Sequence, residues 1–235
     1  MAKPSKPRRS LSSAGLDAAA SESAAAALPE AVPRPVAAVP QRSRKQRTQA
    51  RDATRDTLVR TGLTLVLERG WSATSVDAVL AQCGVPKGSF YHYFKSKDEF
   101  GFAVLDSYQS YFLKRLNQWF GAPSDKLRLS ERFAGFLADS EAGVLRYEFR
   151  RGCLIGALGQ EVASLHNEFR LRLEKSLAQW DDVLARCLAR SGIQGDCHLL
   201  AHAFWAGWEG AVLRAMLSHD VTPLRVAIKR FLASL

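Results

Sequence analysis

The segment from Gly84 to Lys97 limits what this chain can fold into more than any other part of its sequence. It opens with a glycine and a proline, is dense in aromatic residues and has lysines near both ends. A largely apolar stretch, Thr74–Cys83, precedes it and is predicted to be helical. A helix, a short turn that contains glycine and a second helix form the layout of a helix-turn-helix, a unit that binds DNA.

The predicted second helix has two different faces. Phe90, Tyr93 and Phe94 share one face at i, i+3 and i+4 and are predicted to be core. The other side keeps donors, planar rings and charges that suit phosphates and base edges: Lys87, Ser89, Tyr91, His92 and Lys95. A lysine-edged amphipathic helix is also common on ordinary surfaces. The turn, the basic flanks and the position near the start of the folded region favour DNA.

The charge of the chain also favours an anionic partner. The chain has 235 residues, enough for one or two domains, and a formal net charge of +10. Such a charge is typical of proteins that bind nucleic acid or an acidic membrane surface. The sequence has no apolar run long enough to span a bilayer and no continuous secretory signal core, although its Ala/Ser/Arg-rich start can imitate an organelle transit peptide.

The four cysteines predict neither a zinc site nor a disulfide framework. None of them forms a Cys-x-x-Cys pair, and no group of cysteine and histidine has zinc-finger spacing. Cys197 and His198 with His202 offer ligands on one helix, but third and fourth ligands are missing. We therefore expect no metal, no cofactor, reduced thiols and a cytoplasmic location.

Residues 1–50 stand apart from the rest. They contain no aromatic residue, six of the nine prolines and a net charge of +6. Such a segment cannot bury enough apolar surface to offset its ordering entropy, so we expect a disordered basic tail. Its end, residues 42–47, could fold along DNA phosphates or into the minor groove. It could equally be a solvated tail that only adds solubility.

From Asp52 onward the pattern is helical. The first helix has an apolar side that includes Leu58, Leu63 and residues 65–67, and Gly70 ends it. We expect Thr74 to cap the next helix together with Asp77, and Ser96 to cap a long helix towards Trp119. Further helices are predicted at about 124–140, 153–163, 167–191, 196–218 and 222–235. The predicted fold is all-helical, with three helices for DNA and about six in a C-terminal domain.

The segment from Arg51 to about Leu116 resembles the DNA-binding half of TetR-family transcriptional regulators. The matching parts are Glu68-Arg69-Gly70-Trp71, Thr74-Ser75-Val76-Asp77, and Gly88 to Phe94 followed by Lys95-Ser96-Lys97. The resemblance implies a TetR-like all-α fold with a tail at 1–50, a helix-turn-helix domain at 51–97 and a ligand-binding and dimerisation domain at 98–235. We assign operator contacts to Arg47, Thr74, Ser75, Lys87, Gly88, Ser89, Tyr91, His92, Tyr93, Lys95 and Lys97.

The resemblance also implies a homodimer that forms through the last two long helices. The stretch 199–216 is apolar nearly all round and contains small residues that permit close approach of another helix: Ala203, Gly207, Gly210 and Ala211. Val226, Ile228, Phe231 and Leu232 of the last helix fit the same two-fold interface. A dimer would place two recognition helices about 34–36 Å apart on a palindromic operator. A monomer with an ordinary buried helix is the alternative.

TetR-like proteins usually release DNA when a small molecule enters the C-terminal domain. Aromatic residues of the predicted helices are candidate pocket walls: Tyr108, Tyr111, Phe112, Trp119, Phe133, Phe136, Trp205 and Trp208. Each of them could also be an ordinary core residue.

Cys153 is a candidate sensor of the small molecule. It follows Arg150, Arg151 and Gly152 at the start of a predicted helix, where the dipole and the cations would favour a thiolate. This stretch resembles TetR regulators that sense N-ethylmaleimide and reactive aldehydes. The rest of the chain is similar to acrylate-responsive repressors of dimethylsulfoniopropionate catabolism genes. Cys153 could react covalently, line a pocket or only pack.

An acrylate-like effector would need a partner for its carboxylate. The candidate cations are Arg150, Arg151, Arg214, His166 and His202. Of these, His166 and Arg214 complete the predicted effector site.

These patterns predict a homodimeric repressor that a small unsaturated or carboxylate-bearing molecule releases from DNA by shifting the long helix at 96–119. One alternative is a TetR-type regulator of an unrelated hydrophobic effector. Others are an enzyme that uses Cys153 with a histidine, and non-specific coating of DNA or a membrane surface by the basic tail. The sequence contains no nucleophile elbow, phosphate loop or dinucleotide fingerprint, so we do not expect an enzyme.

Overall fold

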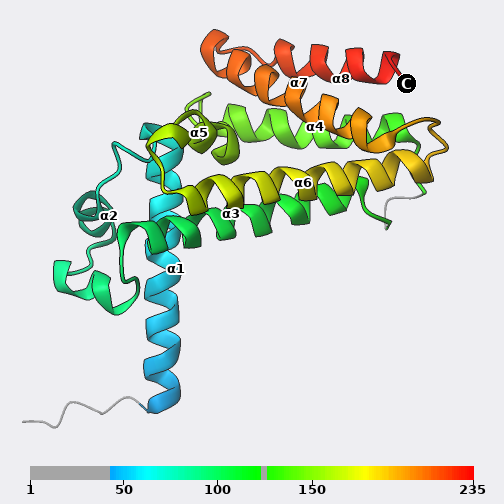
Figure 1. The fold of residues 1–235 in the computed structure, drawn as a ribbon. Helices are drawn as coiled ribbons and strands as arrows, with labels where there is room; N and C mark the ends of the chain where they lie inside the picture. The colour runs from blue at the N-terminus through cyan, green and yellow to red at the C-terminus, as the bar shows by residue number, and fades with distance from the viewer. Residues whose placement is uncertain (1–42, 123–125) are drawn as a thin grey trace, which may run out of the picture. The chain divides into compact units, whose positions relative to one another are not determined.

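Every regular element in the computed structural model is a helix, among the residues that it describes, 43–122 and 126–235 (Figure 1). The elements are α1 (Arg44–Arg69), α2 (Val76–Cys83), the 3₁₀ helix η1 (Lys87–His92), α3 (Lys97–Phe120), α4 (Leu129–Arg146), α5 (Leu154–Gln160), the 3₁₀ turn η3 (Val162–Ser164), α6 (Asn167–Arg190), α7 (Cys197–Ser218) and α8 (Thr222–Ala233). The predicted all-α class is confirmed. The predictions for residues 1–42 and for the side chain of Arg47 lie outside the described part.

Helix α1 begins earlier than the sequence pattern predicts. The Ser43 hydroxyl accepts a hydrogen bond from the Gln46 amide at 3.3 Å, and the Gln46 side chain accepts one from the Ser43 amide at 2.9 Å. This capping box satisfies two amides that a helix start leaves without partners. Residues 44–50, which we assigned to the tail, therefore form the first turns of α1.

An aromatic cluster holds the helix-turn-helix against the start of α3. The rings of Phe90, Phe94 and Phe100 lie 5.1–5.6 Å apart, two of the three pairs edge to face. All three side chains are buried, and Tyr93 is half-buried beside them. Each such pair stabilises the fold by about 0.5–1.5 kcal/mol beyond the area that it buries. The predicted apolar face of the second helix is therefore confirmed for Phe90 and Phe94.

The second helix itself is shorter and tighter than predicted. It is a 3₁₀ helix that ends at His92, not a regular helix that continues to Lys95. Pro86 precedes it, and Gly88, a weak helix former, lies within its first turn. The Arg51 guanidinium of α1 donates a hydrogen bond to the His92 carbonyl at 3.0 Å, so the end of η1 is fixed by α1.

Helix α3 begins and ends where the sequence predicts. The Ser96 hydroxyl accepts from the Glu99 amide at 3.0 Å, and the Glu99 carboxylate accepts from the Lys95 amide at 2.6 Å. Gly121 ends the helix. Its 24 residues span about 36 Å. It packs on α1 at its start and also on α4 and α6, so it joins the DNA-binding elements to the C-terminal helices.

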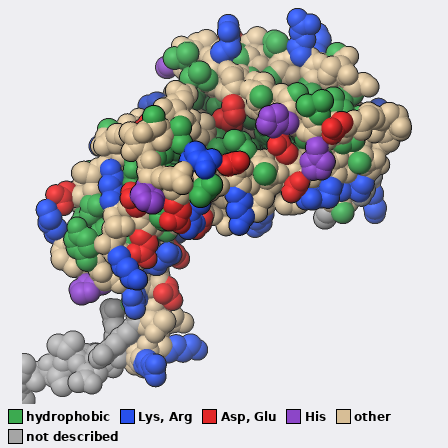
Figure 2. Space-filling model, viewed as in Figure 1, with side chains coloured by type: hydrophobic (Ala, Val, Ile, Leu, Met, Phe, Trp, Pro, Cys, Tyr) green, Lys and Arg blue, Asp and Glu red, His purple; other side chains and the backbone are tan. Residues whose placement is uncertain are grey.

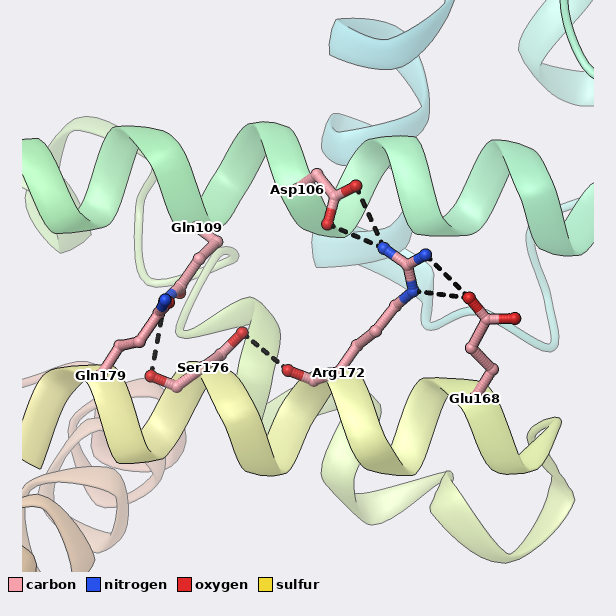
Figure 3. A network of polar contacts seen from close by, with 6 residues as sticks. All are labelled: Asp106, Gln109, Glu168, Arg172, Ser176 and Gln179. Atoms are coloured by element: carbon pink, nitrogen blue, oxygen red, sulfur yellow. Dashed lines mark hydrogen bonds and ion pairs between the residues drawn. The ribbon is translucent and has the colours of Figure 1, made fainter.

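A polar network fixes α3 to α6 (Figure 3). The Arg172 guanidinium contacts Asp106 of α3 at 3.1–3.2 Å and Glu168 of its own helix at 2.7–3.0 Å. Further along, the Gln109 amide donates to the Gln179 side chain at 2.8 Å, and the Trp180 indole donates to Gln109 at 3.0 Å. Because Gln109 and Trp180 are buried, a slip between the two helices would leave polar groups unpaired. The network therefore sets their register.

The core of the C-terminal half is aromatic. The rings of Phe133, Phe136, Phe204, Trp205 and Trp208 form a continuous set of contacts between α4 and α7. Phe231 of α8 packs on the same set. Among the described helices, none has the length and apolar character needed to cross a lipid bilayer.

Candidate DNA-binding surface and effector site

Most of the predicted DNA contacts lie on one exposed surface around η1. We call the exposed set the η1 surface: Ser75, Lys87, Gly88, Tyr91, His92 and Lys95. Tyr91 is 67% exposed although it is a large aromatic residue. Ser89 and Tyr93 are half-buried. In Figure 2, Lys and Arg side chains are spread over the part of the molecule that contains α1 and its neighbours.

One helix cap and one salt bridge shape this surface. Ser75, not Thr74, caps α2: its hydroxyl accepts from the Ala78 amide at 3.1 Å. Asp77 does not complete that cap but pairs with Lys87 at 2.9 Å. The hydrogen bond from Lys87 to Asp77 raises the pKa of the lysine, which stays charged where a phosphate would lie.

Thr74 and Lys97 are not available as predicted. The Thr74 side chain is 2% exposed, and its hydroxyl donates to the Gly70 carbonyl at 2.7 Å. It therefore closes the turn between α1 and α2 and cannot hold a phosphate. The Lys97 ammonium donates to the Trp71 carbonyl at 3.1 Å and lies 4.5 Å from the centre of the Trp71 ring. Burial lowers the pKa of Lys97. Its ammonium group therefore contacts the turn between α1 and α2 and does not extend from the η1 surface.

The side chain of Cys153 lies between two other titratable side chains that come from distant parts of the sequence. The Tyr108 hydroxyl of α3 donates to the Cys153 sulfur at 3.4 Å. The Glu209 carboxyl of α7 lies close to the same residue and raises the pKa of its thiol. Gly156 of α5 lies against that carboxyl, and a Cβ atom at this position would collide with it. We call Tyr108, Cys153 and Glu209 the Cys153 cluster.

All members of the Cys153 cluster favour their neutral forms. Burial, followed by the Glu209 carboxyl, raises the pKa of Cys153 well above its usual value. Burial and then Cys153 raise the pKa of Tyr108, and burial raises that of Glu209. These surroundings oppose the predicted thiolate, because they raise the pKa of the thiol. The local reason is that neither preceding arginine faces the sulfur.

The cations that the sequence offers for an effector carboxylate are used elsewhere. Arg150 pairs with Glu148 at 3.3 Å, and Arg151 binds Glu68 of α1 at 2.6 and 2.9 Å. His166 is exposed and accepts from the Glu168 amide at the start of α6. His202 is exposed and pairs with Asp181, and Arg214 is exposed. Among the described residues, none of the five forms a hydrogen bond or ion pair with the Cys153 cluster, and the effector roles of His166 and Arg214 stay predictions.

Sequence reasoning missed Glu209. It is the only acidic residue in α7, a helix that is otherwise mostly apolar. A single carboxyl among apolar residues was the available signal, because a buried acid needs a partner.

The aromatic candidates come from α3, α4 and α7, and one of them, Phe112, contacts a member of the cluster. Phe112 stacks on Tyr108 with ring centres 5.8 Å apart and also contacts Trp205. Phe133 and Trp208 are buried in the same core, whereas Trp119 is half-buried and donates to Asp139 at 2.7 Å. The indole nitrogen of Trp205 is buried and has no hydrogen-bond partner within the described residues. Their role in binding an effector stays a prediction.

A separate shallow cleft of about 230 Å³ opens between α1 and α3. Its lining is mostly polar: Arg55, Asp56, Val59, Ala103, Asp106, Ser107 and Ser110. It contains none of the predicted effector residues, and Arg172 already occupies the Asp106 carboxylate. We therefore take the Cys153 cluster, and not this cleft, as the candidate effector site.

The segment that carries Cys153 is attached to the DNA-binding elements at both of its ends. At the first end, Arg151 binds Glu68 near the end of α1. At the other end, the Glu161 carboxylate accepts hydrogen bonds from the Trp71 and Ser72 amides at 2.7 and 2.8 Å. We call residues 151–161 the sensor segment. Sequence reasoning did not identify these two attachments, because the partners lie 83 and about 90 residues apart.

Glycine at position 70 permits the second attachment. Gly70 has φ = +82°, and a side chain there would meet the Glu161 carboxylate. Burial alone would raise the pKa of Glu161, but hydrogen bonds from Ser72 and Trp71 outweigh it and lower the pKa. The carboxylate is therefore ionised at neutral pH and holds the turn between α1 and α2.

Helix α7 presents an exposed face of small and apolar residues. They are Leu199, Ala203, Gly207, Gly210, Leu213 and Leu217, which follow helical spacing. Apart from the backbone of α7 itself, no atom of the described residues lies within 4 Å of the position that a Cβ on Gly207 or Gly210 would occupy. Ala211, Ile228 and Phe231, which we expected in a dimer interface, are buried within the subunit instead. Val226 of α8 is exposed.

The chain matches known regulators along most of its length. Residues 58–104 match the family described as bacterial regulatory proteins, tetR family, and residues 130–231 match the tetracyclin repressor-like C-terminal domain. The chain is 41% identical to the transcriptional regulator AcuR of Cereibacter sphaeroides over 82% of this chain and 91% of that protein. It is 30% identical to the HTH-type transcriptional repressor NemR of Escherichia coli K12, over 74% and 90%.

Solved structures agree with these relatives. The regulatory protein TetR from Rhodobacter sphaeroides matches with a TM-score of 0.71 and 40% identity, over 76% of this chain and 96% of that one. These similar proteins are regulators, which confirms the expectation that the chain is not an enzyme. The chain belongs to the TetR family of bacterial transcriptional regulators.

Proposed function

We propose that this regulator is a repressor that binds a palindromic operator as a homodimer, and that a small unsaturated carboxylic molecule such as acrylate releases it. The observation that carries the proposal is the sensor segment. One stretch of eleven residues, 151–161, contains the Cys153 cluster's thiol and both attachments to the DNA-binding elements. A molecule that moves this segment acts directly on the turn between α1 and α2.

The η1 surface is the part that would enter the major groove. It combines a basic side chain at each end with an exposed aromatic ring and an imidazole between them. Lysine ammonium groups bind phosphates, and tyrosine and histidine offer donors to phosphates or base edges. Arg51 and Asp77 hold this surface in place from α1 and α2.

The exposed face of α7 is the part that would pair with a second subunit. Small residues at its centre let two helices approach closely, and leucines at its ends would be removed from water. A two-fold interface of this kind places two η1 surfaces on one side of the dimer. Their spacing then decides whether adjacent major grooves fit both.

Release requires two conformations that effector and DNA prefer differently. In the state described, Glu161 holds the α1–α2 turn and Arg151 holds the end of α1. An effector that displaces the sensor segment would loosen both contacts and let the helix-turn-helix rotate with α3. A coupling free energy of about 1–3 kcal/mol changes DNA affinity by about 5- to 150-fold.

The neutral thiol favours non-covalent binding of the effector. A protonated thiol is a poor nucleophile, and burial keeps Cys153 protonated. We therefore place Cys153 in the proposal as a wall of the effector site and not as a residue that is alkylated.

Replacing Tyr91 or Lys95 with alanine should weaken operator binding and leave the fold intact. Because Lys95 is a charge that would face phosphate, its loss should lower the slope of log affinity against log salt by about one per subunit. The Tyr91 variant should lose affinity without that change in slope. Fluorescence anisotropy with the DNA upstream of the protein's own gene measures both.

The matched controls are Tyr111→Ala and Lys175→Ala, which change exposed positions elsewhere. Equal operator affinities for all four variants would exclude the η1 surface as the DNA contact.

Gly207→Glu should convert the dimer to monomers. The position is open within the subunit, so the new side chain causes no internal collision. Replacing glycine by another residue also stabilises the helix by about 0.5–1 kcal/mol. Between two subunits the same side chain would bury an unpaired charge. Sedimentation velocity gives the mass. The control is Gly143→Glu on α4, also open, and a dimer that survives in the Gly207 variant would contradict the proposed interface.

Acrylate should release the operator from both the native protein and Cys153→Ser, and dilution of acrylate should restore binding. The reason is that a neutral, non-reacting thiol is replaced by a hydroxyl of similar size. A gel shift with the same upstream DNA tests this. Irreversible release that occurs only with the native thiol would show covalent capture instead. No release at any acrylate concentration would reject this effector.

Glu161→Gln should separate effector binding from release. The variant replaces a carboxylate that accepts from two amides by a neutral amide, whose nitrogen cannot accept. Operator affinity without acrylate should fall, because the contact that holds the α1–α2 turn is weakened, while acrylate still binds. The remaining effect of acrylate on operator affinity should be several-fold smaller than in the native protein. Calorimetry and anisotropy measure the separate quantities, with the exposed Glu174→Gln as control. Native-like release by Glu161→Gln would exclude the sensor segment as the route.

A further inference from the structure

Glu209 lies where a basic side chain was expected. It extends from α7 to the Cys153 thiol and lies against Gly156, whose missing side chain leaves room for the carboxyl group. Tyr108 completes the surroundings from α3. The three side chains offer hydrogen-bond donors and acceptors but no positive charge.

Several charged groups on the packed elements form ion pairs away from Glu209. From α6, Asp181 and Asp182 pair with His202 and His198 on the exposed side of α7. From α8, Arg225 pairs with Glu141 of α4 at 2.7 Å. At the start of α5, Arg151 is held by Glu68. Within the described residues, the groups that act on the Glu209 carboxyl are its buried surroundings and Cys153.

A second observation points to a missing acceptor at this place. Trp205 lies four residues before Glu209 on α7, so both side chains leave the same face of the helix. Trp205 is 3% exposed, and its indole N–H has no acceptor within the described residues. An unpaired buried donor costs about 1–3 kcal/mol, and a ligand oxygen would remove that cost.

We infer that Glu209 recognises the effector by sharing one proton with the effector's carboxyl group, and that the site therefore takes a small monocarboxylic acid or its neutral amide without any cation. This inference rests on the proposed function, because it concerns the effector of the same site. Two carboxyl groups in contact cannot both be ionised, so one proton lies between them in the complex. Where Glu209 is ionised in the free protein, that proton comes from solvent. The Trp205 N–H is the second donor to the ligand.

The raised pKa of Glu209 supports this arrangement, since burial already favours its protonated form. Because the complex needs that proton, the affinity for a carboxylate is highest at low pH and falls as pH rises above the pKa of Glu209. The loss approaches tenfold per pH unit. A neutral amide has no second charge to neutralise, and its affinity does not depend on the Glu209 proton in this way.

Isothermal titration calorimetry with acrylate and with acrylamide tests the inference on the full-length dimer. The range is from about pH 5, where free carboxylates are ionised, to about pH 9, near the highest values known for buried glutamate. We expect the dissociation constant of acrylate to rise with pH and that of acrylamide to stay flat. In Glu209→Gln, a neutral variant of the same shape, the acrylate slope should disappear. Glu174→Gln should keep it.

The outcomes separate the inference from the proposed function. A flat acrylate profile in the native protein, or a slope that persists in Glu209→Gln, would overturn the inference and leave an acrylate-responsive repressor standing. Binding of neither ligand at any pH would overturn both. Near-native melting temperature of Glu209→Gln confirms that its fold is retained, and titration of Trp205→Phe should show weaker binding of both ligands with an unchanged pH slope.

Discussion

The attachment of the sensor segment to the end of α1 and to the turn that follows it is the interaction on which the proposed regulation depends. A carboxylate that accepts from two backbone amides and a guanidinium that binds a carboxylate are both directional, charge-assisted contacts. They connect residues 151–161 to the turn that enters the helix-turn-helix. Apolar packing alone would tolerate small shifts, whereas these contacts either form or break. They therefore suit a two-state response better than a gradual one.

The α3–α6 network has a complementary role. Arg172 and Gln109 hold α3 in one register on α6, and α3 also packs on α1. Movement of the sensor segment therefore acts on a DNA-binding unit whose other connection, α3, behaves as a rigid rod. The sequence pattern predicted the long helix α3 and attributed the release of DNA to a shift of this helix alone. The structure adds a second connection beside it, and the proposed mechanism needs both.

What the sequence predicted well follows from local rules. The Ser96 cap and the buried Phe90 and Phe94 each depend on neighbours within a few residues. The start of α1 was missed, although Ser43 and Gln46 have capping-box spacing, because the composition of residues 1–50 favoured a tail. Thr74 was misassigned because two adjacent residues could cap α2, and only the packing of the turn decides between them.

The site was harder to predict because its members come from distant parts of the chain. Tyr108, Cys153 and Glu209 are brought together by three different elements, and no spacing rule relates them. The same holds for Glu161 and its amide donors. Family resemblance pointed to Cys153 itself, but it did not describe which groups surround it. The Glu209 carboxyl raises the pKa of the Cys153 thiol, which is the opposite effect from that expected of the arginines that precede it in the sequence.

The free energies of the competing effects explain why the residues next to Cys153 in the sequence do not determine the protonation of its thiol. A helix N-terminus favours an anion by about 0.3–1 kcal/mol, and α5 has only seven residues. Exposed cations such as Arg150 add little, because water screens them. Removing an anion from water costs several kcal/mol, and the Glu209 carboxyl beside the sulfur adds to that cost. Burial therefore outweighs the local charges, and a site built in this way favours ligands that arrive neutral or bring a proton with them.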